Sequence, residues 1–279
     1  MRQTMDDDKK RSFFIRLRSS VIVTVLAAAA LWCGELVLFL AVAAVSLIGL
    51  FEMLQALGLR KTGLEIAAFM SAVLYLEAVW LNWDKWLFFA IFLGFMLIMG
   101  TYVFTWPKYT AEQAAQTVFA VLYIPVMLSF IYRTEVLTEG NIACTALTLL
   151  AAWCSDVGAY CMGMLFGKTK LTPLLSPKKT VEGAIGAVLF SAGVGALYGL
   201  IFANALQLFE KPWLSVMILF AWGSILAQIG DLIASAIKRN RGIKDYGTLI
   251  PGHGGIMDRF DSVIVTAPTI YYLILLLMK

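Results

Sequence analysis

Three aspartates in the last third of the chain have the residue type and spacing of a cation site. Asp231 lies inside an apolar stretch, and Asp258 and Asp261 are three residues apart where the next stretch begins. An ionised carboxylate inside a membrane needs a partner, and a helix would project Asp258 and Asp261 from one face. Oxygen ligands favour a hard cation, with Mg²⁺ preferred where phosphate completes its shell. The alternative is that Asp258 and Asp261 only stabilise a helix N-terminus.

Basic residues follow these acids at matching positions. Ser235 and Lys238 come four and seven residues after Asp231, so a helix would place all three on one face. Arg239 and Lys244 continue the cluster into the next loop. Such a group beside a metal site suits a polyphosphate, whose charge it neutralises during transfer. The alternative is that Lys238 and Arg239 only anchor the end of a membrane helix.

A glycine-rich run lies between Lys244 and Asp258 and reads Pro251-Gly252-His253-Gly254-Gly255. Glycines let backbone amides approach an anion closely, and a loop that runs into a helix start can cradle a phosphate. We expect the single histidine to hydrogen-bond a phosphate or a base. A flexible turn is the alternative interpretation.

A second polar segment, 176–183, reads SPKKTVEG and offers three phosphate donors: Lys178, Lys179 and Thr180. Glu182 follows near the start of the next apolar stretch, where a carboxylate suits the helix dipole. Upstream, Asp156 is a further acid at membrane depth and therefore a candidate functional residue. Its alternative role is to pair with a buried cation or hydroxyl.

The composition indicates what positions these residues. The 279 residues are 61% apolar and 14% charged, with a mean hydropathy of +0.83, against about 45–50% and about 25% in soluble domains. A chain of this size cannot hide that much apolar surface from water. These values exclude a soluble enzyme, a nucleic-acid-binding protein, a disordered chain and a secreted disulfide scaffold. We therefore predict an integral membrane protein.

The apolar stretches are apolar on every face, which favours an all-α polytopic helical bundle over a barrel of alternating strands. About nine spans are predicted, at 18–32, 35–57, 64–81, 86–105, 113–132, 141–161, 184–203, 213–237 and 259–278. The break at Cys33-Gly34 is the weakest, and one kinked helix there would leave eight. Glutamates near span ends, including Glu35 and Glu52, are interpreted as interfacial residues and not as ligands.

Polarity divides the single membrane domain into two regions. Residues 1–140 carry about five spans with plain, short loops, whereas residues 141–279 contain two long polar loops, at 162–183 and 238–258. All but four of the 22 Lys and Arg residues fall on the side of the N-terminus, the exceptions being Lys85, Arg133, Lys211 and Lys279. The positive-inside rule then places both polar loops, and the predicted active site, in the cytoplasm.

The segment 235–261 resembles the signature of the phosphatidate cytidylyltransferases, the CDP-diacylglycerol synthases of bacteria. The matching positions are Ser235, Lys238-Arg239, Lys244-Asp245, Pro251, His253-Gly254-Gly255, Asp258-Arg259 and Asp261. The segments SPKKTVEG, DVGAY and Gly230-Asp231 are similar as well, except that Val157 stands where a hydroxyl residue is expected. The N-terminal half contributes only its hydropathy to this resemblance.

The resemblance implies that the protein converts CTP and phosphatidic acid into CDP-diacylglycerol and pyrophosphate in the bacterial cytoplasmic membrane. It also implies Mg²⁺ dependence, K⁺ as a candidate second ion and a homodimer. Asp231, Asp258 and Asp261 would hold the metal, and Lys238 would join them in catalysis. The expected substrate-binding residues are Asp156, Lys178, Lys179, Thr180, Glu182, Ser235, Arg239, Lys244, Asp245, His253, Gly254, Gly255 and Arg259.

Two other classes of protein remain open at this stage. CDP-alcohol phosphotransferases and polyprenyl-type transferases also use aspartates and Mg²⁺ in membranes, but in DxxD or DGxxAR-like patterns, whereas here the acids flank a GHGG loop. A cation or phosphate transporter could line its pathway with Asp156 and Asp231. It would need polar gates at both faces, and the outer loops are short and poor in charge.

Overall fold

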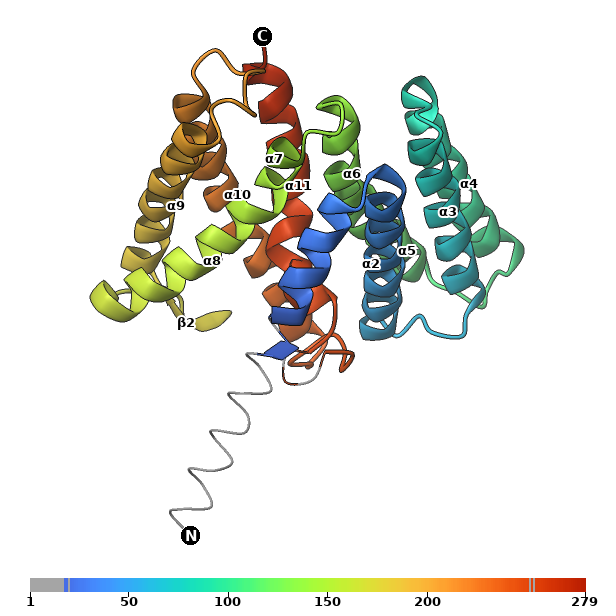
Figure 1. Cartoon of the computed structure of the whole chain (residues 1–279). Helices are drawn as coiled ribbons and strands as arrows, with labels where there is room; N and C mark the ends of the chain where they lie inside the picture. The colour runs from blue at the N-terminus through green and yellow to red at the C-terminus, as the bar shows by residue number, and fades with distance from the viewer. Residues whose placement is uncertain (1–17, 20, 251, 253) are drawn as a thin grey trace.

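The computed structural model describes residues 18–19, 21–250, 252 and 254–279. Within this part of the chain, eight helical segments are long and apolar enough to cross a membrane, so the protein is a multi-pass helical membrane protein (Figure 1). They are Glu35–Ala56 (α2), Gly63–Trp80 (α3), Asp84–Phe104, Ala111–Leu137, Ile142–Phe166, Val181–Ile201 (α9), Pro212–Asn240 (α10) and Met257–Leu277 (α11).

Three of these segments combine shorter elements. Asp84–Trp86 (η1) leads into Leu87–Phe104 (α4), and Ile142–Thr145 (α7) leads into Leu147–Phe166 (α8). Ala111–Val121 (α5) continues through the π-helical turn Leu122–Val126 (η2) into Met127–Leu137 (α6). Pro125 lies inside that turn, where its missing N–H and its ring disrupt the regular α-helical bonding.

The predicted span 18–32 differs from the others. Its described part forms the shorter apolar helix Val21–Trp32, which brings the count of spanning-length helices among the described residues to eight and not nine. Gly34, with a φ of 99°, separates this helix from α2, and glycine adopts such a backbone conformation more readily than other residues. The break predicted at Cys33-Gly34 is therefore present.

The predicted loop 162–183 contains structure that an all-helical prediction misses. Lys170–Thr172 (β1) pairs antiparallel with Ser176–Thr180 (β2), and the two strands form a hairpin. Lys170 lies opposite Thr180, and Thr172 lies opposite Ser176. Both predicted polar loops are also shorter than expected, because helix continues into their ends. The connections run over 167–180 and 241–256.

Close packing joins the helices that carry the polar segments. A Cβ at Gly195 of α9 would lie 2.6 Å from the Val216 carbonyl oxygen of α10, and one at Gly199 would lie 2.6 Å from that of Pro212. Small residues allow such close approach of helix backbones in membranes. Helices α9 and α10 therefore meet backbone to backbone.

Figure 1 shows helices α2 to α6 on one side of the bundle and α8 to α11 on the other. One buried cluster nevertheless contains residues of both halves, including Leu50 and Met53 of α2 with Met257 and Val263 of α11. The hairpin and the connection between α10 and α11 lie at the same end of the bundle, opposite the C-terminus.

Candidate active site

A cavity of about 380 Å³ lies where the hairpin meets α8, α9, α10 and α11. It brings together acids and bases that are far apart in the sequence. Its polar and charged lining residues are Asp156, Tyr160, Lys178, Lys179, Thr180, Gln228, Asp231, Asp258, Arg259, Asp261 and Ser262. Both polar segments and Asp156 thus contribute to one cavity.

Asp231 connects helix α10 to the hairpin. Its carboxylate forms an ion pair with the Lys179 ammonium of β2 and accepts a hydrogen bond from the Ser235 hydroxyl at 3.4 Å. The predicted shared face of Asp231 and Ser235 is confirmed by this contact. Both side chains of the ion pair are partly exposed to the cavity, so an entering ligand can compete for either partner.

Asp156 of α8 and Asp261 of α11 meet at Ser262. The Ser262 hydroxyl donates to the two carboxylate oxygens of Asp156 at 3.2 and 3.3 Å, and the Ser262 amide donates to Asp261 Oδ1 at 2.8 Å. Within the described residues, neither carboxylate has a Lys or Arg partner within 4.0 Å. This part of the cavity therefore holds two carboxyl groups without a direct basic partner.

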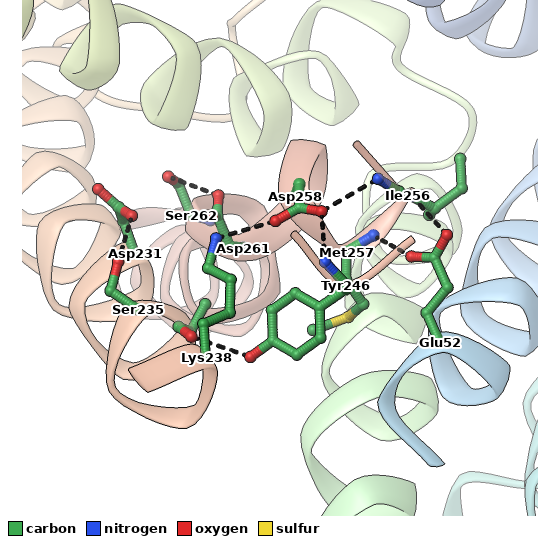
Figure 2. Close-up of polar contacts among 12 residues, drawn as sticks. Glu52, Asp231, Ser235, Lys238, Tyr246, Ile256, Met257, Asp258, Asp261 and Ser262 are labelled. Carbon is green, nitrogen blue, oxygen red and sulfur yellow. Dashed lines mark hydrogen bonds and ion pairs between the residues drawn. The ribbon is translucent and has the colours of Figure 1, made fainter. Parts of the chain in front are cut away.

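Asp258 fastens the connection 241–256 to the helices around it. Its Oδ1 accepts a hydrogen bond from the Lys238 ammonium at 2.8 Å, and its Oδ2 accepts one from the Tyr246 amide at 2.8 Å (Figure 2). Oδ2 also accepts a hydrogen bond from the Gly255 amide at 3.0 Å. The Tyr246 hydroxyl donates to the Ala234 carbonyl at 2.9 Å. Burial raises the pKa of Tyr246, so its hydroxyl remains a donor.

The glycine-rich run packs against the start of α11. The Gly255 amide donates to Asp258 at 3.0 Å, and its role in binding an anion of the substrate stays a prediction. A Cβ at Gly254 would lie 2.6 Å from Asp258 Oδ2, so the run packs tightly around this carboxylate. The predicted substrate role of His253 concerns a residue outside the described part of the chain.

Other predicted residues do not line the cavity. Glu182 accepts hydrogen bonds from the amides of Lys168 at 3.0 Å and Thr169 at 3.1 Å, and thus fixes the entry to the hairpin. Arg239 donates to the Leu175 carbonyl at 3.5 Å. Lys244 and Asp245 are exposed in the connection after α10. Their predicted substrate roles depend on contacts that only a bound ligand would make.

Sequence reasoning missed two residues of this region, Glu52 and Ser262. The interpretation of Glu52 as interfacial is wrong, since only 4% of the residue is exposed and its carboxylate accepts amide hydrogen bonds from the start of α11. Its one local signal was a charge inside an apolar run. Ser262 had only its place beside Asp261 as a signal.

The donor chemistry of the cavity fits a hard cation. No group of three Asp, Glu, His or Cys side chains within the described ranges stands ready to hold a metal by itself. Magnesium is usually held by one or two carboxylates together with substrate phosphates, and Asp231 and Asp261 both line the cavity. Asp258 also lines it, with its oxygens engaged as described.

The fold and the cavity define a class: a multi-pass helical membrane protein whose acids and bases converge at one end of the bundle. The sequence model described as "Cytidylyltransferase family" matches residues 14–277. The chain belongs to the cytidylyltransferase family.

Individual relatives agree with this assignment. Proteins named phosphatidate cytidylyltransferase are similar to the chain in three bacteria: Staphylococcus epidermidis (34% identity over 64% of this chain and 66% of the relative), Bacillus subtilis (31%, over 65% and 66%) and Staphylococcus saprophyticus (35%, over 70% and 72%). The matched segment spans about two thirds of the length of the first two relatives.

Proposed function

We propose that the protein transfers the cytidylyl group of CTP to phosphatidic acid, forming CDP-diacylglycerol and pyrophosphate for phospholipid synthesis. One observation carries the proposal: a single cavity in a member of the cytidylyltransferase family combines four acids with three bases. The acids are Asp156, Asp231, Asp258 and Asp261, and the bases are Lys178, Lys179 and Arg259. This arrangement can bind a polyphosphate and a second phosphate in one place.

The lipid phosphate itself is the nucleophile in this reaction. One of its oxygens attacks the α-phosphorus of CTP in line, a new phosphorus–oxygen bond forms, and the bond to the β-phosphate oxygen breaks. The electron pair of that bond leaves with pyrophosphate, and no covalent intermediate with the protein is required. The protein therefore contributes by holding two anions close together and by neutralising their charge.

The basic residues differ in how they are held. Lys179 is paired with Asp231, so an incoming triphosphate offers its ammonium a second anionic partner. Lys178 and Arg259 line the cavity without an ion pair among the described residues and are free to bind phosphate. Lys238 is oriented by Asp258 at 2.8 Å, which fixes its charge beside the cavity wall.

We propose Asp231, Asp258 and Asp261 as the residues that hold Mg²⁺, with K⁺ as a candidate second ion. When bound, Mg²⁺ withdraws charge from the transferring phosphoryl group and from the departing pyrophosphate. Ser262 keeps Asp156 and Asp261 in place through its hydroxyl and amide, and Ser235 supports Asp231.

We also propose that the cavity faces the cytoplasm of a bacterial cell. The basic connections at 57–62, 167–180 and 241–256 share one end of the bundle (Figure 1), as the positive-inside rule requires of cytoplasmic loops. A homodimer, implied by the resemblance in sequence, is part of the same proposal, and native mass spectrometry in detergent would measure it.

The proposed reaction can be tested with purified protein in liposomes that contain phosphatidic acid. With CTP labelled at the α-phosphate, we expect label in the lipid fraction only when Mg²⁺ is present, and none after chelation. Asp261→Asn should reduce this transfer by at least about 100-fold. The matched control Asp84→Asn changes an exposed aspartate of η1 that forms an ion pair with Arg133 at 3.5 Å and should retain wild-type activity. Absence of label in the lipid, or equal activity without Mg²⁺, would contradict the proposal.

A further inference from the structure

Glu52 is a buried carboxylate from the N-terminal half of the chain that reaches the candidate active site. It lies near the end of α2 and is 4% exposed. One of its oxygens, Oε1, accepts a hydrogen bond from the Ile256 amide at 3.0 Å, and Oε2 accepts from the Met257 amide at 2.9 Å (Figure 2). A residue more than 200 positions away thus binds the start of α11.

These hydrogen bonds supply what the start of α11 lacks. The first amides of a helix have no partner inside the helix, and the helix dipole favours negative charge beside them. A side chain at the N-cap position usually satisfies one of them, but Ile256 in that position makes no such hydrogen bond. The Glu52 carboxylate therefore caps α11 from another helix.

The surrounding backbone is shaped to admit this carboxylate. A Cβ added at Gly247 or at Gly255 would collide with the carboxylate oxygens of Glu52. Neither glycine has a positive φ, so the requirement at both positions is space and not backbone conformation. The connection between α10 and α11 is thus folded around the end of the Glu52 side chain.

The residues fixed in this way are those proposed for catalysis. Asp258 lies in the first turn of α11 and Asp261 one turn later, while Asp258 also binds Lys238 and the Gly255 amide. A shift at Ile256 and Met257 would move these groups together.

We propose that Glu52 is a positioning residue that fixes the start of α11 and the connection 241–256, and thereby sets where Asp258 and Asp261 lie in the cavity. The activity measurements below rest on the proposed cytidylyl transfer, whereas the exchange measurement does not.

The first test compares Glu52→Gln with Glu35→Gln. Glutamine keeps the size of the side chain but has one acceptor oxygen, so its NH₂ group faces one of the two amide donors. Glu35 is the matched control, because it lies at the other end of α2 and also accepts an interhelical hydrogen bond, from the Tyr132 hydroxyl at 2.6 Å.

At equal amounts of folded protein, we expect Glu52→Gln to lower kcat by about 10- to 100-fold, as is typical when a partner that orients metal ligands is lost. The Mg²⁺ concentration for half-maximal activity should rise as well. Glu35→Gln should stay within about twofold of wild type in kcat and in the Mg²⁺ concentration for half-maximal activity. Wild-type kcat and Mg²⁺ response in Glu52→Gln would overturn the proposal.

Hydrogen exchange of the backbone gives a measurement that does not depend on turnover. We expect the amides of Ile256 and Met257 to exchange about tenfold faster in Glu52→Gln, with 264–277 unchanged. Unchanged exchange at 256–257, or an equal increase along all of α11, would overturn the positioning role. If wild-type protein lacked cytidylyl transfer while this exchange pattern appeared, only the proposed function would fail.

A second-site experiment covers a Glu52→Gln variant that fails to fold. Gly247→Ala should push the Glu52 carboxylate aside and lower kcat by about 10-fold, because the new methyl group would take the space of its oxygen. The matched change Gly193→Ala meets open space and should have no effect on kcat. Wild-type kcat in Gly247→Ala would also overturn the proposal.

Discussion

The four acids of the cavity are each held by a specific partner in the protein. Lys179 holds Asp231, Lys238 holds Asp258 at 2.8 Å, and Ser262 links Asp156 to Asp261. In the Lys179–Asp231 pair both side chains are partly exposed, at 22% and 28%, so a ligand that supplies new charge can rearrange this pair at little cost. Lys238 and Asp258 are more deeply buried, at 15% and 4%, and this pair is the more firmly fixed of the two.

Lys179 gives the prediction that belongs at this scale. We expect Lys179→Gln to raise the KM for CTP by about 10-fold or more, since charge-assisted hydrogen bonds contribute about 1.5–3 kcal/mol. Steady-state kinetics at saturating phosphatidic acid would measure it. Lys170→Gln changes an exposed residue of β1 that does not line the cavity; it is the control and should leave the KM within about twofold. An unchanged KM in Lys179→Gln would show that the hairpin lysine does not contact the nucleotide.

The elements that carry these residues are fixed by close packing and by caps. Helix α9 follows β2 directly. Thr180 is its N-cap residue, and the Thr180 hydroxyl accepts a hydrogen bond from the Gly183 amide at 3.1 Å. Gly195 then lets α9 approach α10 closely. The hairpin is thus attached at its base to the helix that faces Asp231.

Two glycines of α9 test this packing. Alanine favours helix over glycine by up to about 1 kcal/mol, so Gly193→Ala, whose Cβ meets open space, should leave stability unchanged or raise it slightly. Gly195→Ala would place a Cβ 2.6 Å from the Val216 carbonyl oxygen and should lower the free energy of unfolding by about 1–3 kcal/mol. Denaturation in mixed detergent would measure both variants. Equal stability of the two would mean that α9 and α10 are less closely packed.

Most of these elements could be predicted from the sequence. A long run that is apolar on every face can satisfy its backbone hydrogen bonds in lipid only as a helix. The acids Asp156, Asp231, Asp258 and Asp261 were found for the same reason, since charge is rare in such runs. The hairpin was missed because its strands are short and rich in Lys, Pro and Thr, which also occur in loops. Glu52 was missed because its partners are backbone amides, which no side-chain pattern reveals.

The whole molecule has two ends of different character. The basic connections and the cavity lie at one end of the bundle and the C-terminus at the other (Figure 1). A site that combines a lipid phosphate with a nucleotide must lie where the bilayer surface meets the solvent that holds the nucleotide. The distribution of Lys and Arg residues and the place of the cavity thus favour the same orientation.

The orientation can be measured with cysteine variants of a protein whose native cysteines are replaced. In intact bacterial cells, a membrane-impermeant maleimide should label Lys211→Cys, between α9 and α10, and leave Lys170→Cys of the hairpin unlabelled until the membrane is opened. Both residues are exposed, so access alone decides the result. Labelling of Lys170→Cys in intact cells would reverse the proposed orientation.

The contact of Glu52 with α11 also limits how far this protein could be shortened. A version cut down to residues 141–279 would keep both polar connections and all four aspartates of the cavity, and by composition it would look complete. Without α2, the amides of Ile256 and Met257 at the start of α11 would lose their acceptor, the Glu52 carboxylate. The shortened protein would also lose much of the buried cluster that α2 shares with α11. We therefore expect a minimal active unit of this protein to include α2.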